Sequence, residues 1–240
     1  MNRNYKEIYD ESLKNPEEFW QKVSEDVFWF KKPTKILKKD NPPFYKWFED
    51  GVTNTCYNAL DLHIDQGRGD KTALIYDSPI TESKAQFTFK ELKEKVSKFA
   101  GALDKQGVKK GDRVIIYMPM IPEAVVAMLA CGRIGAIHSV VFGGFASNEL
   151  ASRIDDSKAK ILITASCGFE PGRTVEYRPL VDGALKLAKH QVEKVILFQR
   201  KGHEVKLNKP LEISWDEALS EADDKDCVEM GANDYAYILY

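Results

Sequence analysis

The chain has 240 residues, with 35 lysines and arginines against 37 aspartates and glutamates, so its formal net charge is −2. This balance excludes the strong basic excess with which most proteins bind duplex nucleic acid, and a content of 43% hydrophobic and 30% charged residues excludes a disordered chain. Its longest apolar candidate, Ala124–Cys131, is far shorter than the ~20 residues of a membrane span.

The N-terminal residues carry no targeting signal that we can identify. Met1–Ser12 mixes acidic and basic side chains and lacks an apolar run, so we expect neither a secretory nor a transit peptide and predict a cytoplasmic protein. Asn15-Pro16-Glu17-Glu18 predicts a helix that begins with an N-cap and a proline in its first turn. The aromatic, proline-broken stretch that follows predicts an irregular segment, and we assign residues 1–55 to an N-terminal segment that wraps a core.

From Tyr57 onward the pattern alternates between helix and strand. Thr88-Phe89-Lys90-Glu91 and Ser214-Trp215-Asp216-Glu217 read as capping boxes, and Ser147 reads as the cap of another helix. The predicted helices cover residues 57–64, 88–106, 122–131, 147–156 and 180–189, and the predicted strands cover residues 72–76, 113–118, 136–142, 160–164 and 192–198. This alternation predicts an α/β fold with a doubly wound, mainly parallel sheet flanked by helices, which we assign to residues 56–240.

The last residues also predict a strand. Asp234–Tyr240 is apolar, aromatic and free of turn residues, which is typical of a buried strand. Because ligands of parallel sheets bind beyond the carboxyl ends of the strands, we expect further site residues after Tyr240 and interpret the chain as the front portion of a longer enzyme.

Two glycine-containing segments follow predicted strands and are candidate binding elements. Phe142-Gly143-Gly144 joins a strand to a helix and would expose backbone N–H groups to an anion, although a tight turn explains it equally well. Ser166–Arg173 ends in Glu170-Pro171-Gly172-Arg173, and its arginine could hold a phosphate. A surface salt bridge from Arg173 to Glu170 or Glu176 is the simpler interpretation of these residues alone.

The remaining polar residues suggest no complete catalytic set. Gly132-Arg133-Ile134-Gly135 lacks the spacing of a dinucleotide fingerprint, and the four histidines are not accompanied by a recognisable nucleophile arrangement. The cysteines are far apart in sequence, which argues against a disulfide framework or a metal site and favours reduced, half-buried side chains: Cys56, Cys131, Cys167 and Cys227. We therefore assign no catalytic and no metal-binding residue to this chain.

These residues nevertheless resemble one family closely, the AMP-forming short-chain acyl-CoA synthetases of the adenylate-forming superfamily. Lys46–Asp61 resembles the family's docked N-terminal segment, Gly111–Val114 and Ile116–Glu123 resemble its first core strand and helix, and Ala130–Ser139 continues the match into Val140–Phe145. The resemblance extends over essentially the whole chain. It implies that residues 56–240 form the first subdomain of the AMP-binding domain and end before the family's ATP phosphate loop.

The resemblance also implies a binding site for coenzyme A (CoA). Glu170, Pro171, Gly172 and Arg173 match the loop that contacts the 3′-phospho-ADP part of CoA in the family, and Phe142, Gly143 and Gly144 resemble the turn that lines the same pocket. Glu170 resembles the propionyl-CoA synthetase type, because the acetyl-CoA synthetase type has an arginine there. A carboxylate at this position would repel phosphate and could serve only by bonding an adenine amine or by orienting Arg173.

Three functions follow as hypotheses. The first is the N-terminal part of a synthetase that activates propionate or acetate with ATP to an acyl-adenylate and transfers the acyl group to CoA; the sites for ATP and Mg²⁺ would lie beyond Tyr240, and the 240 residues alone would be inactive. The second is a stand-alone, non-catalytic CoA- or nucleotide-binding module. The third, a dinucleotide-dependent oxidoreductase, rests on the α/β pattern alone. In each case the expected partners are small molecules, with neither nucleic acid nor membrane.

Overall fold

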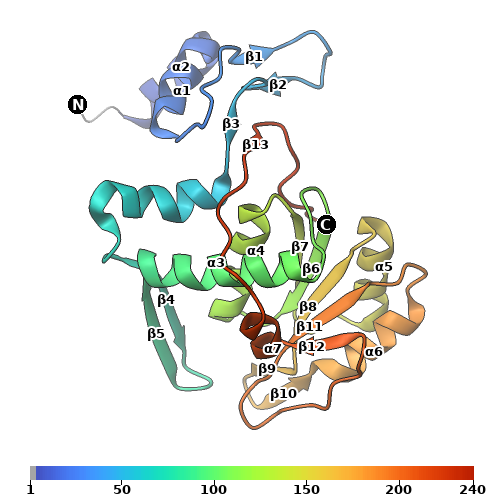
Figure 1. The fold of residues 1–240 in the computed structure, drawn as a ribbon. Coiled ribbons are helices and arrows are strands. Elements are labelled where there is room, and N and C mark those ends of the chain that lie inside the picture. The colour runs from blue at the N-terminus through green and yellow to red at the C-terminus, as the bar shows by residue number, and fades with distance from the viewer. Residues whose placement is uncertain (1–3) are drawn as a thin grey trace. The chain divides into compact units, whose positions relative to one another are not determined.

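The computed structural model describes residues 4–240, and these form two units. One unit contains residues 4–54 together with Glu229–Asp234, and the other contains Thr55–Val228 together with Tyr235–Tyr240. Figure 1 traces the chain through both units. No helix within residues 4–240 is long and apolar enough to cross a membrane.

The smaller unit combines short helices with short strand pairs. Its helices are α1 (Tyr5–Lys14), α2 (Pro16–Val23) and the 3₁₀ turn η1 (Ser24–Asp26), and its strands are β1 (Leu37–Lys38), β2 (Lys46–Trp47), β3 (Val52–Thr53) and β13 (Met230–Gly231). Strand β1 pairs with β2, and β3 with β13, both antiparallel. The predicted helix at Pro16 is confirmed, with Asn15 as its N-cap residue. Helix α1 was not predicted, although Asn4 and Glu7 form a capping box at its start.

The larger unit is built on a five-stranded parallel sheet in the order β12-β11-β8-β6-β7. The strands are β6 (Arg113–Met118), β7 (Ile137–Phe142), β8 (Ile161–Ala165), β11 (Lys194–Phe198) and β12 (Glu212–Ser214). The helices are α3 (Phe89–Lys105), α4 (Pro122–Arg133), α5 (Ser147–Ser157), α6 (Tyr177–Leu187) and α7 (Trp215–Ser220). The predicted α/β class and parallel sheet are confirmed.

The strand order explains why helices cover both faces of this sheet. The chain steps from β6 outward to β7 and then passes back across β6 to β8. Because crossovers between parallel strands are right-handed, opposite steps place α4 and α5 on opposite faces. Figure 1 accordingly shows α3 and α4 on one side of the sheet and α5 and α6 on the other. The step reverses between β6 and β8, so a crevice is expected at their carboxyl ends.

The centre of the sheet is apolar on both faces. All five residues of β8 are buried, as are Val114–Met118 in β6, which is why these strands read as continuous hydrophobic runs in the sequence. The helix predicted after Thr88 is confirmed, because Thr88 and Glu91 form the expected capping box and α3 ends one residue before Gln106. The positive φ of Gly107, 87°, then turns the chain toward β6.

Two local predictions need refinement. The helix expected at residues 57–64 is present but consists of π-helical turns, η2 (Tyr57–Asp61) and η3 (Ile64–Arg68). The strand expected at residues 72–76 is present as β4 (Thr72–Ser78), which pairs with an unpredicted antiparallel strand, β5 (Ser83–Thr88). The sequence of β5, SKAQFT, is mostly polar because most of its residues stay exposed or only half-buried.

Three other expectations are corrected. The N-cap of α5 is Ala146, and the Ser147 hydroxyl instead donates to the carbonyl of Leu180 in α6. Ser166–Arg173 was expected as a loop, but most of it belongs to a hairpin of two antiparallel strands, β9 (Cys167–Glu170) and β10 (Arg173–Glu176). Asp234–Tyr240 forms no strand: its one bridge pairs Tyr237 with His138 of β7, and most of its large side chains are exposed.

Candidate functional site

A cavity of about 340 Å³ lies at the carboxyl ends of β6 and β7 and against β9, which follows β8, close to where the strand order predicts a ligand crevice. The ends of β6 and β7, the β9 strand and the turn between β4 and β5 contribute its walls. The lining residues are Tyr76, Asp77, Ser78, Pro79, Ile80, Thr81, Met118, Pro119, Met120, Ile121, Val140, Val141, Phe142, Gly143, Gly168, Phe169, Glu170, Tyr177 and Arg200. The site is therefore largely apolar, with few charged groups.

Two tyrosines hold the glycine turn after β7. The Tyr117 hydroxyl accepts a hydrogen bond from the backbone N–H of Gly144, 3.1 Å away, and donates to the carbonyl oxygen of Phe145 at 2.8 Å. The Tyr177 ring lies 4.9 Å from the Tyr117 ring, centroid to centroid. Burial raises the pKa of both phenols, so both remain protonated O–H groups at neutral pH.

Tyr177 also explains why two glycines occur in this site. Its side chain is only 2% exposed, and its hydroxyl lies against the backbone of Gly143 and of Gly168. A Cβ atom on either glycine would overlap this hydroxyl. The phenol therefore occupies the space that side chains at these two positions would fill, and the backbone of the turn stays open to the cavity.

The hairpin formed by β9 and β10 separates the predicted residues Glu170–Arg173. Glu170 lines the cavity, whereas Pro171, Gly172 and Arg173 are not among the residues that line it. Gly172 occupies the turn with a φ of 75°. The Arg173 guanidinium donates from Nε, at 2.7 Å, and from Nη2, at 2.6 Å, to Oε2 of Glu170, and its side chain is 70% exposed. The salt bridge that we considered as the simpler interpretation is thus present.

Arg200 is the charged residue that the sequence analysis missed. It follows the end of β11 and lines the cavity. Its backbone N–H donates to the Ser166 hydroxyl at 2.8 Å, and its guanidinium carbon lies 4.8 Å from the centroid of the Phe169 ring. Only its position two residues after a predicted strand could have pointed to it. Among the described residues that line the cavity, Arg200 is the one cation.

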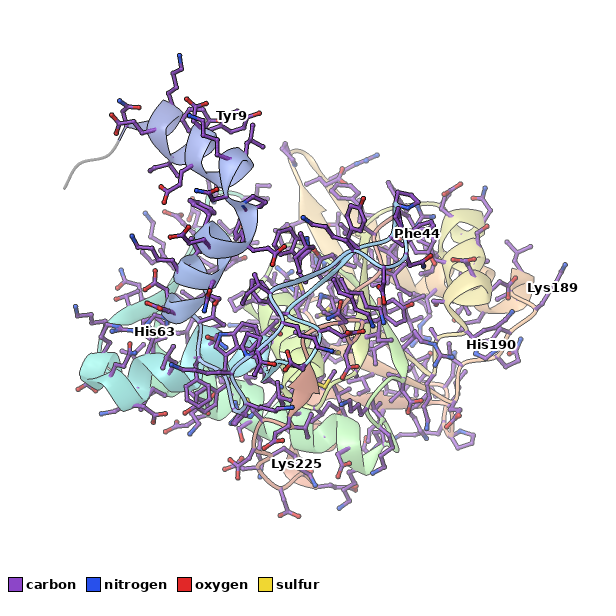
Figure 2. The ribbon with its side chains drawn as sticks, turned by 90° about the horizontal axis from the view of Figure 1, so that it is seen from above. Tyr9, Phe44, His63, Lys189, His190 and Lys225 are labelled. Carbon is purple, nitrogen blue, oxygen red and sulfur yellow. The ribbon has the colours of Figure 1, made fainter. Side chains whose placement is uncertain are left out.

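The structure thus brings together some of the predicted residues and not others. Phe142, Gly143 and Glu170 line one cavity, and Gly144 is adjacent, since a Cβ on it would lie 3.7 Å from Oε1 of Glu170. Figure 2 shows His63 and His190 on opposite sides of the larger unit.

Among residues 4–240, one group of side chains has the spacing of a metal site: Cys56, Asp61 and Cys227. These donors do not suit Mg²⁺, which prefers oxygen ligands. The Arg133 guanidinium also lies among them, 2.7 Å from the Asp61 carboxylate, and its charge would repel a cation. No magnesium-dependent step is therefore assigned to this part of the molecule.

Comparisons with known proteins agree with this architecture. Residues 63–240 match the family model described as AMP-binding enzyme, and residues 5–59 match the model of the acetyl-coenzyme A synthetase N-terminus. The chain is similar in fold to an acetoacetyl-CoA synthetase from Streptomyces lividans, with a TM-score of 0.88 and 24% identity, over 100% of this chain and 36% of that one.

Curated relatives are more similar in sequence. The human mitochondrial acyl-CoA synthetase short-chain family member 3 is 52% identical over 98% of this chain and 34% of its own length. An acetyl-coenzyme A synthetase from Xylella fastidiosa is 45% identical over 98% of this chain and 37% of its own length. The chain spans about a third of the length of these relatives. Because the family model covers residues 63–240, the chain belongs to the AMP-binding enzyme family.

Proposed function

We propose that this chain is the N-terminal part of an AMP-forming acyl-CoA synthetase that acts on a short-chain carboxylate. The observation that carries the proposal is the cavity at the carboxyl ends of β6 and β7, with a glycine turn and one arginine in its walls. The 52% identity to a short-chain acyl-CoA synthetase over almost the whole chain supports the same conclusion.

The proposed reaction has two steps. The carboxylate attacks the α-phosphate of ATP and releases pyrophosphate, and the thiol of CoA then displaces AMP from the acyl-adenylate. Two steps are needed because a carboxylate oxygen is a poor leaving group until adenylation improves it. Within this scheme the chain supplies scaffold and part of the CoA site, and we assign it no catalytic residue.

For the CoA site we propose Phe142, Gly143 and Gly144 with Glu170, Pro171, Gly172 and Arg173, and we add Arg200. Arg200 lines the cavity and carries a guanidinium, the group best suited to phosphate oxygens. Arg173 is paired with Glu170, so it would have to exchange that carboxylate for a phosphate or remain a support for it. The Glu170 carboxylate is suited to accept a hydrogen bond from an adenine amine.

Calorimetric titration with CoA tests this site in three single variants. A charged hydrogen bond contributes about 1.5–3 kcal/mol, so we expect Arg200→Gln to weaken CoA binding by about 10- to 100-fold. Arg173→Gln should have a smaller effect if Arg173 only supports Glu170. Lys189→Gln is the matched control, because Lys189 is exposed at the surface (Figure 2) and should leave binding unchanged. Unchanged binding in both arginine variants would contradict the proposed site.

The acyl group and the activity are tested separately. We propose propionate as the preferred acid, with acetate as the alternative, because Glu170 resembles the propionate-specific type. We expect no carboxylate-dependent exchange of pyrophosphate into ATP by the purified 240 residues, since ATP and Mg²⁺ sites are not assigned to them. Exchange above the no-carboxylate background would contradict the proposal that the ATP and Mg²⁺ sites lie outside these 240 residues.

We further propose that the protein acts in the cytoplasm on small-molecule substrates. The similar human protein is described as mitochondrial, so the location needs its own measurement. Fractionation of the native source with matrix and cytosolic marker enzymes distinguishes the two compartments.

A further inference from the structure

A buried cluster of two thiols, a carboxylate and a guanidinium lies in the larger unit, and the proposed function does not use it. Cys56 and Arg133 are both 0% exposed, and Cys227 is half-buried. The Sγ atoms of Cys56 and Cys227 and a carboxylate oxygen of Asp61 all lie within 4.8 Å of one another. Two cysteines separated by 227 − 56 = 171 positions in the sequence are thus neighbours in space.

Arg133 organises this cluster from the end of α4. Its Nη1 atom donates to Cys227 Sγ at 3.1 Å, to Cys56 Sγ at 3.7 Å and to Oδ2 of Asp61 at 2.7 Å. Its Nη2 atom donates to Oδ1 of Asp61 at 3.0 Å. The guanidinium lies against both sulfurs, but the thiolate, which is the reactive form of cysteine, is favoured on Cys56. The hydrogen bond between the two thiols and burial raise the pKa of Cys227, which therefore keeps its proton.

Cys227 lies in residues 222–228, which we call the return segment and which contains neither helix nor strand. This segment is held against α3 and α4 by named contacts. Ser97 donates from its hydroxyl to the Lys225 carbonyl at 2.7 Å, and Gly101 lets Asp223 approach so closely that a Cβ there would overlap its carbonyl. Lys225 marks the segment in Figure 2.

The geometry points to a modification site rather than a metal site. We propose that Cys56 and Cys227 form a disulfide when a hydroperoxide oxidises them, and that this bond fixes the return segment to the helical turn that carries Cys56. A disulfide requires the two sulfurs to close from within 4.8 Å to about 2.05 Å, a small movement for a cysteine in a segment without regular structure.

The chemistry balances with hydrogen peroxide as the oxidant. The Cys56 thiolate attacks one peroxide oxygen, an S–O bond forms, the O–O bond breaks, and the departing hydroxide takes up the Cys227 thiol proton as water. The Cys227 thiolate that remains then attacks the sulfur of the Cys56 sulfenic acid, an S–S bond forms, the S–O bond breaks, and the departing hydroxide takes up the proton that Cys56 had released and leaves as a second water. Two thiols are oxidised by two electrons, and one peroxide is reduced to two waters.

The two sulfurs have complementary environments for these steps. Cys227 is the accessible one and therefore the point of entry for peroxide. A hydrogen bond from Cys227 lowers the pKa of the Cys56 thiol, and the Arg133 charge adds to this against the opposing effect of burial. Cys131 offers the opposite case: it is fully buried, and burial alone raises its pKa to about 12, so it should resist oxidation.

The test is a peptide map of the 240-residue protein after treatment with a stoichiometric amount of hydrogen peroxide. Free thiols are alkylated under denaturing conditions, and the digest is analysed without reduction. We expect loss of two of the four thiols per chain, one cross-linked peptide pair that joins Cys56 to Cys227, and alkylated Cys131 and Cys167. The treated wild-type chain supplies this result without any mutation.

Variants provide the controls. Cys227→Ser and Cys56→Ser should each abolish the cross-link, and Cys131→Ser should retain it. Because Cys56 is fully buried and its variant could fail to fold, the half-buried Cys227 is the deciding position. A map in which all four thiols stay alkylated, in which Cys227 reaches sulfinic acid without a link, or in which Cys131 reacts as fast as Cys227 would overturn the proposal.

Discussion

At the scale of single residues, Arg133 and Asp61 form a buried ion pair in the larger unit. The Arg133 side chain is 0% exposed and that of Asp61 is 10% exposed, and two parallel hydrogen bonds join them. Burial raises the pKa of Asp61, but the hydrogen bonds and charge of Arg133 outweigh this and hold the pKa below 3.8. The pair is therefore fully ionised at neutral pH, and each charge depends on the other.

Removal of one partner should be strongly destabilising. Asp61→Asn removes the buried counter-ion of Arg133 and leaves Asp226, which is exposed and 4.0 Å away, so we expect the free energy of unfolding to fall by about 3–5 kcal/mol. Urea denaturation followed by circular dichroism measures this change. The exposed pair of Glu170 and Arg173 is the matched control, because Arg173→Gln should cost less than about 1 kcal/mol. Equal losses in the two variants would contradict the argument from burial.

Some residues of the candidate site could be predicted from the sequence, and others could not. Gly143 was detectable because a glycine after an apolar strand is a local signal. Arg200 was not, because its place in the cavity depends on the neighbouring strands β8 and β11 and on Phe169, about thirty positions earlier in the chain. The ion pair between Glu170 and Arg173 was foreseen as one of two interpretations, since a tight turn brings these positions together.

At the scale of elements, one predicted helix cap is confirmed and another is wrong. Thr88 accepts a hydrogen bond from the N–H of Glu91 and forms the predicted capping box. Ser147 was also predicted to cap a helix, but it is the first residue of α5 and bonds to α6 instead. The two residues look alike in sequence because each precedes an amphipathic run, and only the packing of α5 on α6 distinguishes them.

These two positions give a paired measurement. Thr88→Ala removes the acceptor for an N–H group at the start of α3, so we expect a loss of about 0.5–2 kcal/mol in unfolding free energy. Ser147→Ala removes a donor to a helix carbonyl and no cap, and its loss should be smaller than that of Thr88→Ala. Thermal unfolding of both variants at equal concentration tests the order. A larger loss in Ser147→Ala would mean that its hydroxyl contributes more than a cap.

The elements predicted best are those whose burial is decided by one continuous pattern. Strands β6 and β8 read as apolar runs because both of their faces are covered. Strand β5 and the hairpin of β9 and β10 were missed because their sequences are polar or rich in small residues, and their pairing is set by the strand beside them. The segment Asp234–Tyr240 was wrongly predicted as a strand, since its apolar character does not supply a pairing partner.

At the scale of the whole molecule, the buried ionisable groups decide how stability depends on pH. His138 lies on β7, and its Nδ1 atom has no hydrogen-bond partner among the described residues. Burial lowers its pKa from 6.5, so the folded state keeps it neutral at a pH where the unfolded chain binds a proton. Stability from this group is present above pH 6.5 and is lost as the pH falls below that value.

The paired carboxylates predict a second pH range in which stability is lost. Burial raises the pKa of Asp61 and of Glu212, but Arg133 and Arg178 respectively outweigh it, and both pKa values end below their ordinary values of 3.8 and 4.5. These groups contribute stability above about pH 4.5, and the contribution is lost as the pH falls through their folded-state pKa values. The molecule should therefore lose stability in two separate steps on acidification.

A substitution at His138 should reduce the loss of stability between pH 7 and pH 5 and leave the loss below pH 4 unchanged. In His138→Leu no proton is taken up at this position on unfolding, so the fall in urea midpoint between pH 7 and pH 5 should be shallower than in the wild type. His63 also has a lowered pKa, from burial and from the charge of Arg68, so His63→Gln is measured alongside and the double variant should be shallower still. Below pH 4 all four proteins should lose stability in parallel, because Asp61 and Glu212 are unchanged. If His138→Leu keeps the wild-type slope between pH 7 and pH 5, the neutral buried imidazole does not control stability there, and the paired carboxylates Asp61 and Glu212 would have to account for the whole acid response.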